Sequence, residues 1–176
     1  ILNNKNNELI SGSDDYLIKI WNLKFVNDEN QCSRTLVGHE CAVNALAISN
    51  DSELLVSGGA DKTIRIWNMK TGKCLRIIKG MPNIICSLVI NRENELISSE
   101  FLFENTIKIW NMTSGQCVRV LDGYASYVNK LIINNENELI SGSDDNTIRI
   151  LNLKRGKCFR ILHGHTNTVC ALVINK

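Results

Sequence analysis

One pattern occurs four times along the 176 residues and constrains the fold more than any other feature. Each copy has two apolar residues, a Ser-rich polar stretch, and a segment in which Ile alternates with Lys or Arg. The copies end at Trp21, Trp67, Trp110 and Leu151, in steps of 46, 43 and 41 residues. Such a period indicates a chain of repeating structural units and excludes helical solenoid repeats of about 33–34 residues.

Each unit is predicted to form four short strands. Residues 63–67 and their counterparts are rich in β-branched side chains and alternate apolar with polar residues, which is typical of strands. No segment keeps the apolar spacing of a helix over three turns. Turn-forming Asp, Asn and Gly residues separate the apolar segments. In the best-preserved unit we expect strands near 42–48, 54–58, 63–68 and 73–78, so the fold class is all-β.

The repeat also sets the domain organisation, because it extends over nearly the whole chain. We treat residues 1–176 as one domain. Its units are approximately 1–37, 38–79, 80–122 and 123–163, followed by a final inner strand in 164–176.

Composition and charge limit the classes of partner. Hydrophobic residues make up 44% and charged residues 22%, and the formal net charge is +2. So weak a charge predicts neither a nucleic acid nor an anionic membrane as partner. No apolar segment approaches the roughly 18–20 residues that span a bilayer.

The seven cysteines are too widely spaced for a zinc site or a disulfide framework. Cys74, Cys117 and Cys158 recur at one place in the repeat, which predicts a small, buried, apolar side chain there. Reduced thiols are typical of the inside of a cell, so we expect an intracellular, cytoplasmic protein. The chain starts without Met and shows no signal peptide, so we expect it to be part of something longer.

The best-preserved unit resembles the WD-repeat family of β-propellers. The family signature is a Gly-His pair, a Ser-Gly stretch that leads to Asp, and a strand that ends in Trp; Gly38-His39, Ser57, Asp61 and Trp67 supply it. Four phased copies make the resemblance specific. It implies a β-propeller of four-stranded antiparallel blades, here about four and therefore a fragment of a larger propeller.

The resemblance also implies a structural network. In the family, the signature His, Ser, Asp and Trp form buried hydrogen bonds, and here these are His39, Ser57, Asp61 and Trp67. Buried polar groups of these types must satisfy one another.

The other units depart from this signature. The first keeps Ser11, Asp15 and Trp21; the third keeps Ser98 and Trp110, with Met81 for His and Glu104 for Asp; the fourth keeps Ser141 and Asp145, with Tyr124 and Leu151 for His and Trp. If the last strand completes the first blade, His165 lies beside Ser11 and the other two network residues of that blade. A closed ring of four blades and a dimer that pools eight remain alternatives, and an open arc would favour self-association.

Three groups of residues raise the question of chemistry. His163 and His165 are two residues apart, as a metal pair would be, but no carboxylate or thiol cluster joins them. Asp14-Asp15 and Asp144-Asp145 recur in turns, where Asp is favoured for its local hydrogen bonds. A repeated basic residue lies between two Ile residues and is expected to extend along the edge of each blade rather than bind phosphate; it is Lys19, Arg65, Lys108 and Arg149. We therefore predict no catalytic residue, metal or cofactor.

The resemblance implies a non-catalytic scaffold that binds other proteins. Two alternatives stay open: a regulatory propeller attached to a catalytic module outside this sequence, and an enzyme with its site in the central channel. The latter needs His, Glu or Arg on inner strands that show mostly Ala, Ile, Leu, Val, Asn and Cys.

One turn predicts where a partner binds. The turn of the third unit is two residues longer than that of the fourth and places Phe101, Leu102 and Phe103 in succession. Aromatic side chains are enriched where partners bind. Alignment adds Met81, Ile84, Tyr124 and Tyr127 to the same face. In the alternative interpretation, Phe101 and Phe103 fill the space left by the missing His.

Overall fold

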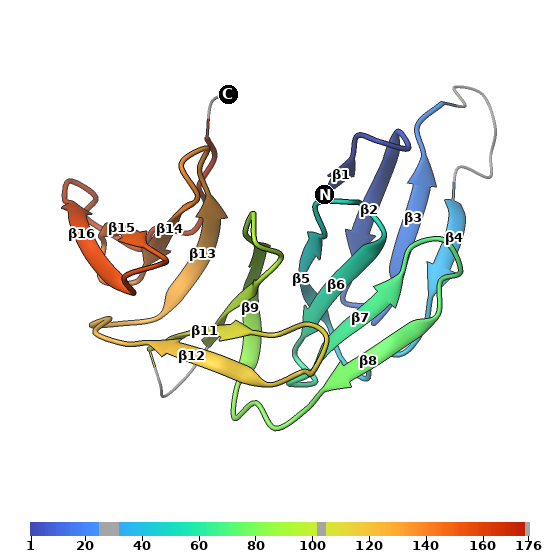
Figure 1. Cartoon of the computed structure of the whole chain (residues 1–176), viewed down its shortest axis with the longest axis horizontal. Helices are drawn as coiled ribbons and strands as arrows, with labels where there is room; N and C mark the ends of the chain where they lie inside the picture. The colour runs from blue at the N-terminus through green and yellow to red at the C-terminus, as the bar shows by residue number, and fades with distance from the viewer. Residues whose placement is uncertain (25–31, 102–104, 175–176) are drawn as a thin grey trace.

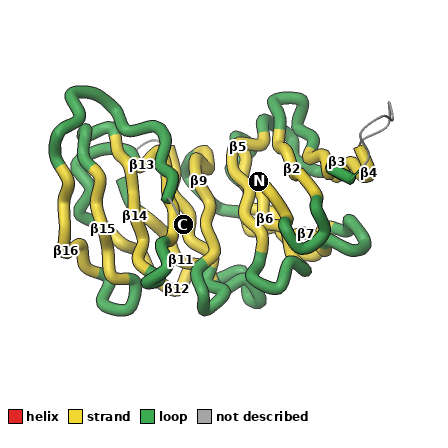
Figure 2. The backbone as a smooth tube through the Cα atoms, turned by 90° about the horizontal axis from the view of Figure 1, so that it is seen from above, coloured by secondary structure: helices red, strands yellow, loops and turns green. Residues whose placement is uncertain are grey.

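The computed structural model describes residues 1–24, 32–101 and 105–174, which form four sheets of four antiparallel strands in chain order (Figures 1 and 2). The first sheet holds β1 (Leu2–Asn3), β2 (Glu8–Gly12), β3 (Ile18–Asn22) and β4 (Cys32–Leu36), and the second holds β5 (Val43–Ile48), β6 (Leu54–Gly59), β7 (Ile64–Asn68) and β8 (Cys74–Ile78). The third holds β9 (Ile84–Ile90), β10 (Leu96–Phe101), β11 (Ile107–Trp110) and β12 (Cys117–Leu121), and the fourth holds β13 (Val128–Ile133), β14 (Glu138–Ser143), β15 (Ile148–Asn152) and β16 (Lys157–Leu162). The predicted all-β fold of four-stranded antiparallel blades is confirmed.

The four sheets follow one another around a common centre and leave an opening between the first and the fourth (Figure 1). In the second sheet, the strands lie within one residue of their predicted positions. One side of the arc carries the loops between sheets and the turns between second and third strands, which contact each other through Asp144 N–H and Tyr127 O at 2.9 Å. We call this side the loop face. The opposite side carries the turns between first and second strands, and we call it the turn face.

The paired aspartates form these turns. In three sheets, a carboxylate oxygen accepts a hydrogen bond from the backbone N–H two residues later: Asp15 from Leu17 at 3.0 Å, Asp61 from Thr63 at 3.1 Å and Asp145 from Thr147 at 3.0 Å. The residue between them has a positive φ, 71° at Tyr16, 59° at Lys62 and 64° at Asn146. The recurrence of Asp thus reflects turn geometry.

Adjacent sheets meet where an apolar side chain is seated on a glycine. A Cβ built on Gly12 of the first sheet would lie 2.6 Å from Val43 Cγ1 of the second. Gly58 faces Ile85 in the same way. A Cβ on Gly142 would lie 2.7 Å from Val169 Cγ1, which belongs to the final segment and not to a sheet. Each cluster of buried apolar side chains joins two neighbouring sheets rather than filling one.

An arginine on the outer strand also links each sheet to the next. Arg76 Nη1 donates to Ser114 O at 3.1 Å and Arg119 Nη1 donates to Leu153 O at 2.5 Å, while Arg34 Nη1 donates to Met69 O. All three acceptors lie in turns of the following sheet. Arg160 holds the same position in β16, is exposed, and has no following sheet among the described residues.

The final segment differs from the expectation that it forms an inner strand. Residues 164–174 contain no strand, although Val169 N–H donates to Ser143 O at 3.1 Å, as Val43 N–H does to Ser13 O. The segment is seated on the fourth sheet, but no described strand pairs with it. His165 is consequently exposed and does not join Ser11, Asp15 and Trp21.

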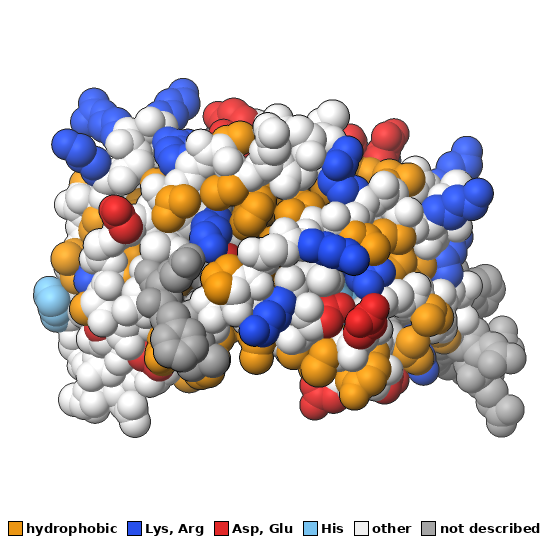
Figure 3. Space-filling view, turned by 90° about the horizontal axis from the view of Figure 1, so that it is seen from below, with side chains coloured by type: hydrophobic (Ala, Val, Ile, Leu, Met, Phe, Trp, Pro, Cys, Tyr) orange, Lys and Arg blue, Asp and Glu red, His pale blue; other side chains and the backbone are white. Residues whose placement is uncertain are grey.

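The prediction of a buried position for the repeated cysteine is wrong, since Cys74, Cys117 and Cys158 are exposed. Each lies where the outer strand contains a bulge opposite the signature Trp or Leu. The thiol contacts the backbone oxygen two residues later, at 3.4 Å for Cys74 and Arg76 O. The recurrence therefore reflects bulge geometry. Figure 3, which looks toward β8 and β12, shows hydrophobic side chains on this rim among Lys and Arg.

We expect Arg119→Ala to lower the free energy of unfolding by about 1–2 kcal/mol, because it removes a charged hydrogen bond between the third and fourth sheets. Arg160→Ala is the matched control and should change it by less than about 0.5 kcal/mol. Urea denaturation of both variants measures the difference, and equal effects would contradict the linking role of Arg119.

Candidate functional site

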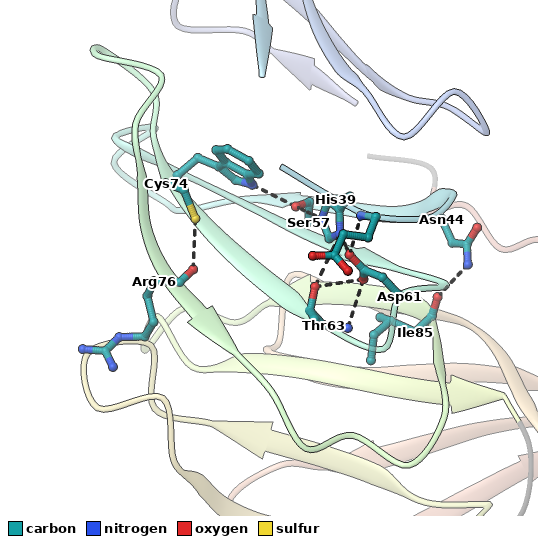
Figure 4. Close-up of polar contacts among 10 residues, drawn as sticks. His39, Asn44, Ser57, Asp61, Thr63, Cys74, Arg76 and Ile85 are labelled. Atoms are coloured by element: carbon teal, nitrogen blue, oxygen red, sulfur yellow. Dashed lines mark hydrogen bonds and ion pairs between the residues drawn. The ribbon is translucent and has the colours of Figure 1, made fainter. Parts of the chain in front are cut away.

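In the second sheet, His39, Ser57, Asp61 and Trp67 lie within one hydrogen-bonded network (Figure 4). His39 Nδ1 is 2.8 Å from Asp61 Oδ2, and His39 Nε2 is 2.7 Å from Ser57 Oγ. Trp67 Nε1–H donates to Ser57 Oγ at 2.8 Å. The network connects a loop, a central strand pair and a turn, so it fixes the loop face at this sheet.

The donors and acceptors define the protonation of His39. Because Ser57 Oγ accepts from Trp67, its own hydrogen is available to His39 Nε2, and His39 Nδ1–H then donates to Asp61. Burial lowers the pKa of His39, which favours this neutral form. Although partial burial acts in the opposite direction, hydrogen bonds from Glu40 N–H, His39 and Thr63 lower the pKa of Asp61.

The first and third sheets retain only part of the network. Trp21 Nε1–H donates to Ser11 Oγ at 2.9 Å, and Trp110 Nε1–H donates to Ser98 Oγ at 2.8 Å. Asp15 is exposed, and its carboxylate accepts a hydrogen bond from Leu17 N–H of the turn backbone. Glu104 lies outside the described residues.

In the fourth sheet, a different set of contacts takes the place of the network. Tyr124 Oη is 3.1 Å from Ser141 Oγ, and the guanidinium of Arg149 lies 5.0 Å from the centre of the Tyr124 ring. Arg149 Nη2 also donates to Asp145 Oδ2 at 3.0 Å. Burial raises the pKa of Tyr124, so its hydroxyl stays neutral. Leu151 is buried in the place of Trp.

We expected the repeated basic residue to extend along the edge of each blade. The structure shows a different arrangement. Arg65 is buried, and Lys108 Nζ lies 3.0 Å from Glu100 Oε1. Lys19 Nζ lies 5.7 Å from the Trp21 ring centre. The position faces the signature Ser across the strand pair, and in the second and third sheets the cation is held among buried groups. Glu100 occupies the repeat position that Gly59 has in the second sheet. This difference in the sequence is the signal that could have predicted the Lys108–Glu100 ion pair.

The residues predicted to bind a partner divide into two groups. Met81 and Tyr124 are buried, which corrects their placement on the surface: Met81 packs in the core between the second and third sheets and Tyr124 in the next core. Phe101, Ile84 and Tyr127 lie together on the loop face. The Phe101 and Tyr127 ring centres are 4.9 Å apart, and Phe101 is paired with Ile84 across β9 and β10. Leu102 and Phe103 lie outside the described residues.

Acidic groups lie near this cluster. Asp144 follows β14 on the loop face and accepts a hydrogen bond from Asn129 Nδ2 at 2.5 Å. Burial raises the pKa of Cys86 to about 11, and the nearby charges of Asp144 and Glu100 act in the same direction. Cys86 is therefore a neutral thiol and not a nucleophile at neutral pH.

A family comparison agrees with this arrangement. The family described as WD domain, G-beta repeat, matches residues 30–68 and 115–152. The chain belongs to the WD-repeat family. WD40 repeats generally mediate protein–protein interactions, and their domains are typically non-catalytic scaffolds.

Each matched WD40 repeat is offset from the sheets by one strand. Within the described residues, the first match contains β4 of one sheet and β5 to β7 of the next, and the second contains β12 and β13 to β15. One repeat thus always connects two neighbouring sheets.

The inner strands of the WD40 sheets surround a cavity of roughly 840 Å³. Its described lining contains Lys130 and the Cys86 thiol but no carboxylate side chain and no imidazole, so these residues provide no acid–base pair. No group of three or more His, Cys, Asp or Glu side chains in the described ranges is arranged to hold a metal ion. The described residues also form no helix that could cross a membrane.

The network predicts that acid destabilises the protein. His39 has an ordinary pKa of 6.5 and a lower one when folded, so below pH 6.5 the unfolded chain binds more protons. The contribution of His39 to the free energy of unfolding is therefore present above pH 6.5 and is lost as the pH falls toward the pKa of His39 in the folded state. We expect the urea midpoint to decrease from about pH 7 to about pH 5. His39→Gln should remove most of that decrease, whereas the exposed His163→Gln should retain it; equal pH profiles would refute the assignment.

The network also predicts unequal effects at equivalent aspartates. Asp61→Ala should lower the free energy of unfolding by about 2–3 kcal/mol, because it leaves the buried His39 without its acceptor. Asp15→Ala, at the same turn position without a His partner, should lower it by less than about 1 kcal/mol. Urea denaturation at neutral pH compares them, and similar losses would mean that turn formation alone explains Asp61.

Proposed function

We propose that this chain is a non-catalytic scaffold that binds other proteins through Phe101, Tyr127 and Ile84, which we call the aromatic patch. The observation that carries the proposal is that Phe101 leaves 37% of its surface exposed at the end of β10 while its ring rests against Tyr127. Exposed aromatic side chains held in one position are frequent anchors of protein interfaces.

The surroundings of the aromatic patch favour a protein as the partner. The patch lies where the third and fourth sheets meet, so it belongs to packed strands and not to an isolated loop. Its neighbour Asp144 supplies a polar rim, which is typical around the apolar centre of an interface. The absence of an acid–base pair from the described cavity lining gives the central-channel enzyme less support. A regulatory domain of a larger enzyme would use the same binding surface.

The free cysteines agree with a scaffold inside the cell. All seven thiols are unpaired, and three of them are exposed on outer strands. We therefore place the scaffold in a reducing, cytoplasmic environment, where such thiols persist.

The proposal predicts that Phe101→Ser weakens partner binding without unfolding the protein. Tyr127 is replaced by a photo-crosslinking phenylalanine analogue, and crosslinked proteins from a lysate are identified by mass spectrometry and then purified for binding assays. Phe101→Ser should lower the affinity of a purified partner by about tenfold or more. Phe159→Ser, which changes an aromatic residue 55% exposed on β16, is the control and should leave the affinity unchanged.

Two results would contradict the proposal. In the first, Phe101→Ser lowers the melting temperature and leaves the affinity unchanged, so the side chain fills the core. In the second, both variants lose affinity equally, so the effect is not specific to the aromatic patch.

A further inference from the structure

A second hollow lies on the turn face, away from the aromatic patch, between the second and third sheets. It has a volume of roughly 690 Å³, within the range of ligand sites. We call it the rim groove. Its apolar lining comes from both sheets and consists of Leu54, Ile66, Leu75, Trp110, Met112 and Val118.

Strand bulges help to build the walls of the rim groove. Trp67 pairs with Cys74 and Ile66 pairs with Arg76, so Leu75 is the extra residue of the β8 bulge. Val118 is the extra residue at the same place in β12. Leu75 is 57% exposed and Val118 is 55% exposed, although both line a groove with a largely apolar floor. Two such side chains on facing walls favour an apolar occupant.

Both walls are also open sheet edges. β8 is the last strand of the second sheet, and β12 is the last strand of the third. An edge strand presents unpaired backbone N–H and C=O groups, which an extended peptide can bind as an added strand. This feature favours a polypeptide over a lipid or a small apolar molecule.

One side of the rim groove is acidic. Glu93 Oε2 accepts a hydrogen bond from Asn137 Nδ2 at 2.6 Å, and Glu95 Oε2 accepts one from Asn91 Nδ2 at 2.6 Å. These donors are neutral, and neither carboxylate makes an ion pair within the described residues. Arg76, the cation in the described lining, donates to Ser114 O. A cationic group of a ligand would therefore complement the two carboxylates.

The hollow between the first and second sheets provides an internal comparison. Its lining includes three cations and three carboxylates, which are Lys5, Arg34, Lys70, Glu8, Asp51 and Glu53. The extra residue of the β4 bulge is Ser33 rather than Leu or Val. The described lining of this hollow thus has a balanced charge and a polar bulge residue on β4, which distinguishes it from the rim groove.

We propose that the rim groove binds an extended peptide segment of another protein, in which an apolar side chain is flanked by Lys or Arg. The apolar side chain lies between Leu75 and Val118, and the cation faces Glu93 and Glu95. The peptide backbone runs along the edge of β8 or β12. This site is on the opposite face from the aromatic patch and does not depend on it.

The test uses the 176-residue chain and a fluorescein-labelled heptapeptide in which Leu-Phe-Leu is flanked by two lysines on each side. Fluorescence polarisation measures its affinity. The acidic counterpart, with Glu for each Lys, is the ligand control. The double variant Leu75→Ser with Val118→Ser, which imitates Ser33, should weaken binding about tenfold or more. Glu93→Gln with Glu95→Gln should weaken it several-fold and reduce its dependence on salt. Phe101→Ser should leave it unchanged.

Three outcomes would overturn the proposal: equal affinity for the basic and acidic peptides, unchanged affinity in the serine double variant, or loss of affinity in Phe101→Ser. A fourth is a dimer in sedimentation that the serine double variant dissociates while the peptide does not bind, which would identify a second copy as the occupant. Melting temperatures of all variants, and the single variant Leu75→Ser, separate loss of binding from loss of folding.

Discussion

The contact between neighbouring sheets is the interaction on which this structure depends. A four-stranded sheet has two faces, and here the buried apolar clusters each span two sheets instead of one. At the closest point a branched side chain is seated on a glycine, as Ile85 is on Gly58 and Val43 on Gly12. The outer-strand arginines add a second link on the rim. Since each WD40 repeat contributes strands to two sheets, the chain itself connects the same pairs.

Most of the correct predictions made from the sequence rest on the period of the repeat. Strand alternation and the fixed period predict the ends of β5 to β8 to within one residue of their observed positions. This succeeds because strand length and turn position are local properties. The signature residues His39 and Asp61 meet because their spacing fits the loop and turn of one sheet. Properties that depend on the neighbouring sheet were harder to predict. Met81 and Tyr124 align with loop residues but are buried between sheets, and the repeated cysteine is exposed because a bulge turns it outward. The inner-strand pattern of residues 168–174 requires a sheet partner, which the described chain does not give it.

The same architecture explains where binding surfaces arise. Packing between sheets uses the faces of the strands, which leaves the loop face, the turn face and the outer edges exposed. The turn insertion near Phe101 changes the loop face at one place, and the bulge residues Leu75 and Val118 change the rim at another. Both changes leave the Trp–Ser hydrogen bonds of the second and third sheets in place. Diversity at such positions on a constant framework is the means by which one fold serves different partners.

Hydrogen exchange of Gly58→Ala tests most directly whether the contact between sheets supports the structure. The new Cβ would overlap Ile85 of the next sheet, so exchange of backbone amides should become faster in both β6 and β9. Because the described strands of the second sheet pack chiefly against β2 and β9 of the neighbouring sheets, β14 and β15 of the fourth sheet should retain their protection. Faster exchange confined to β6, or spread equally over all four sheets, would contradict the account.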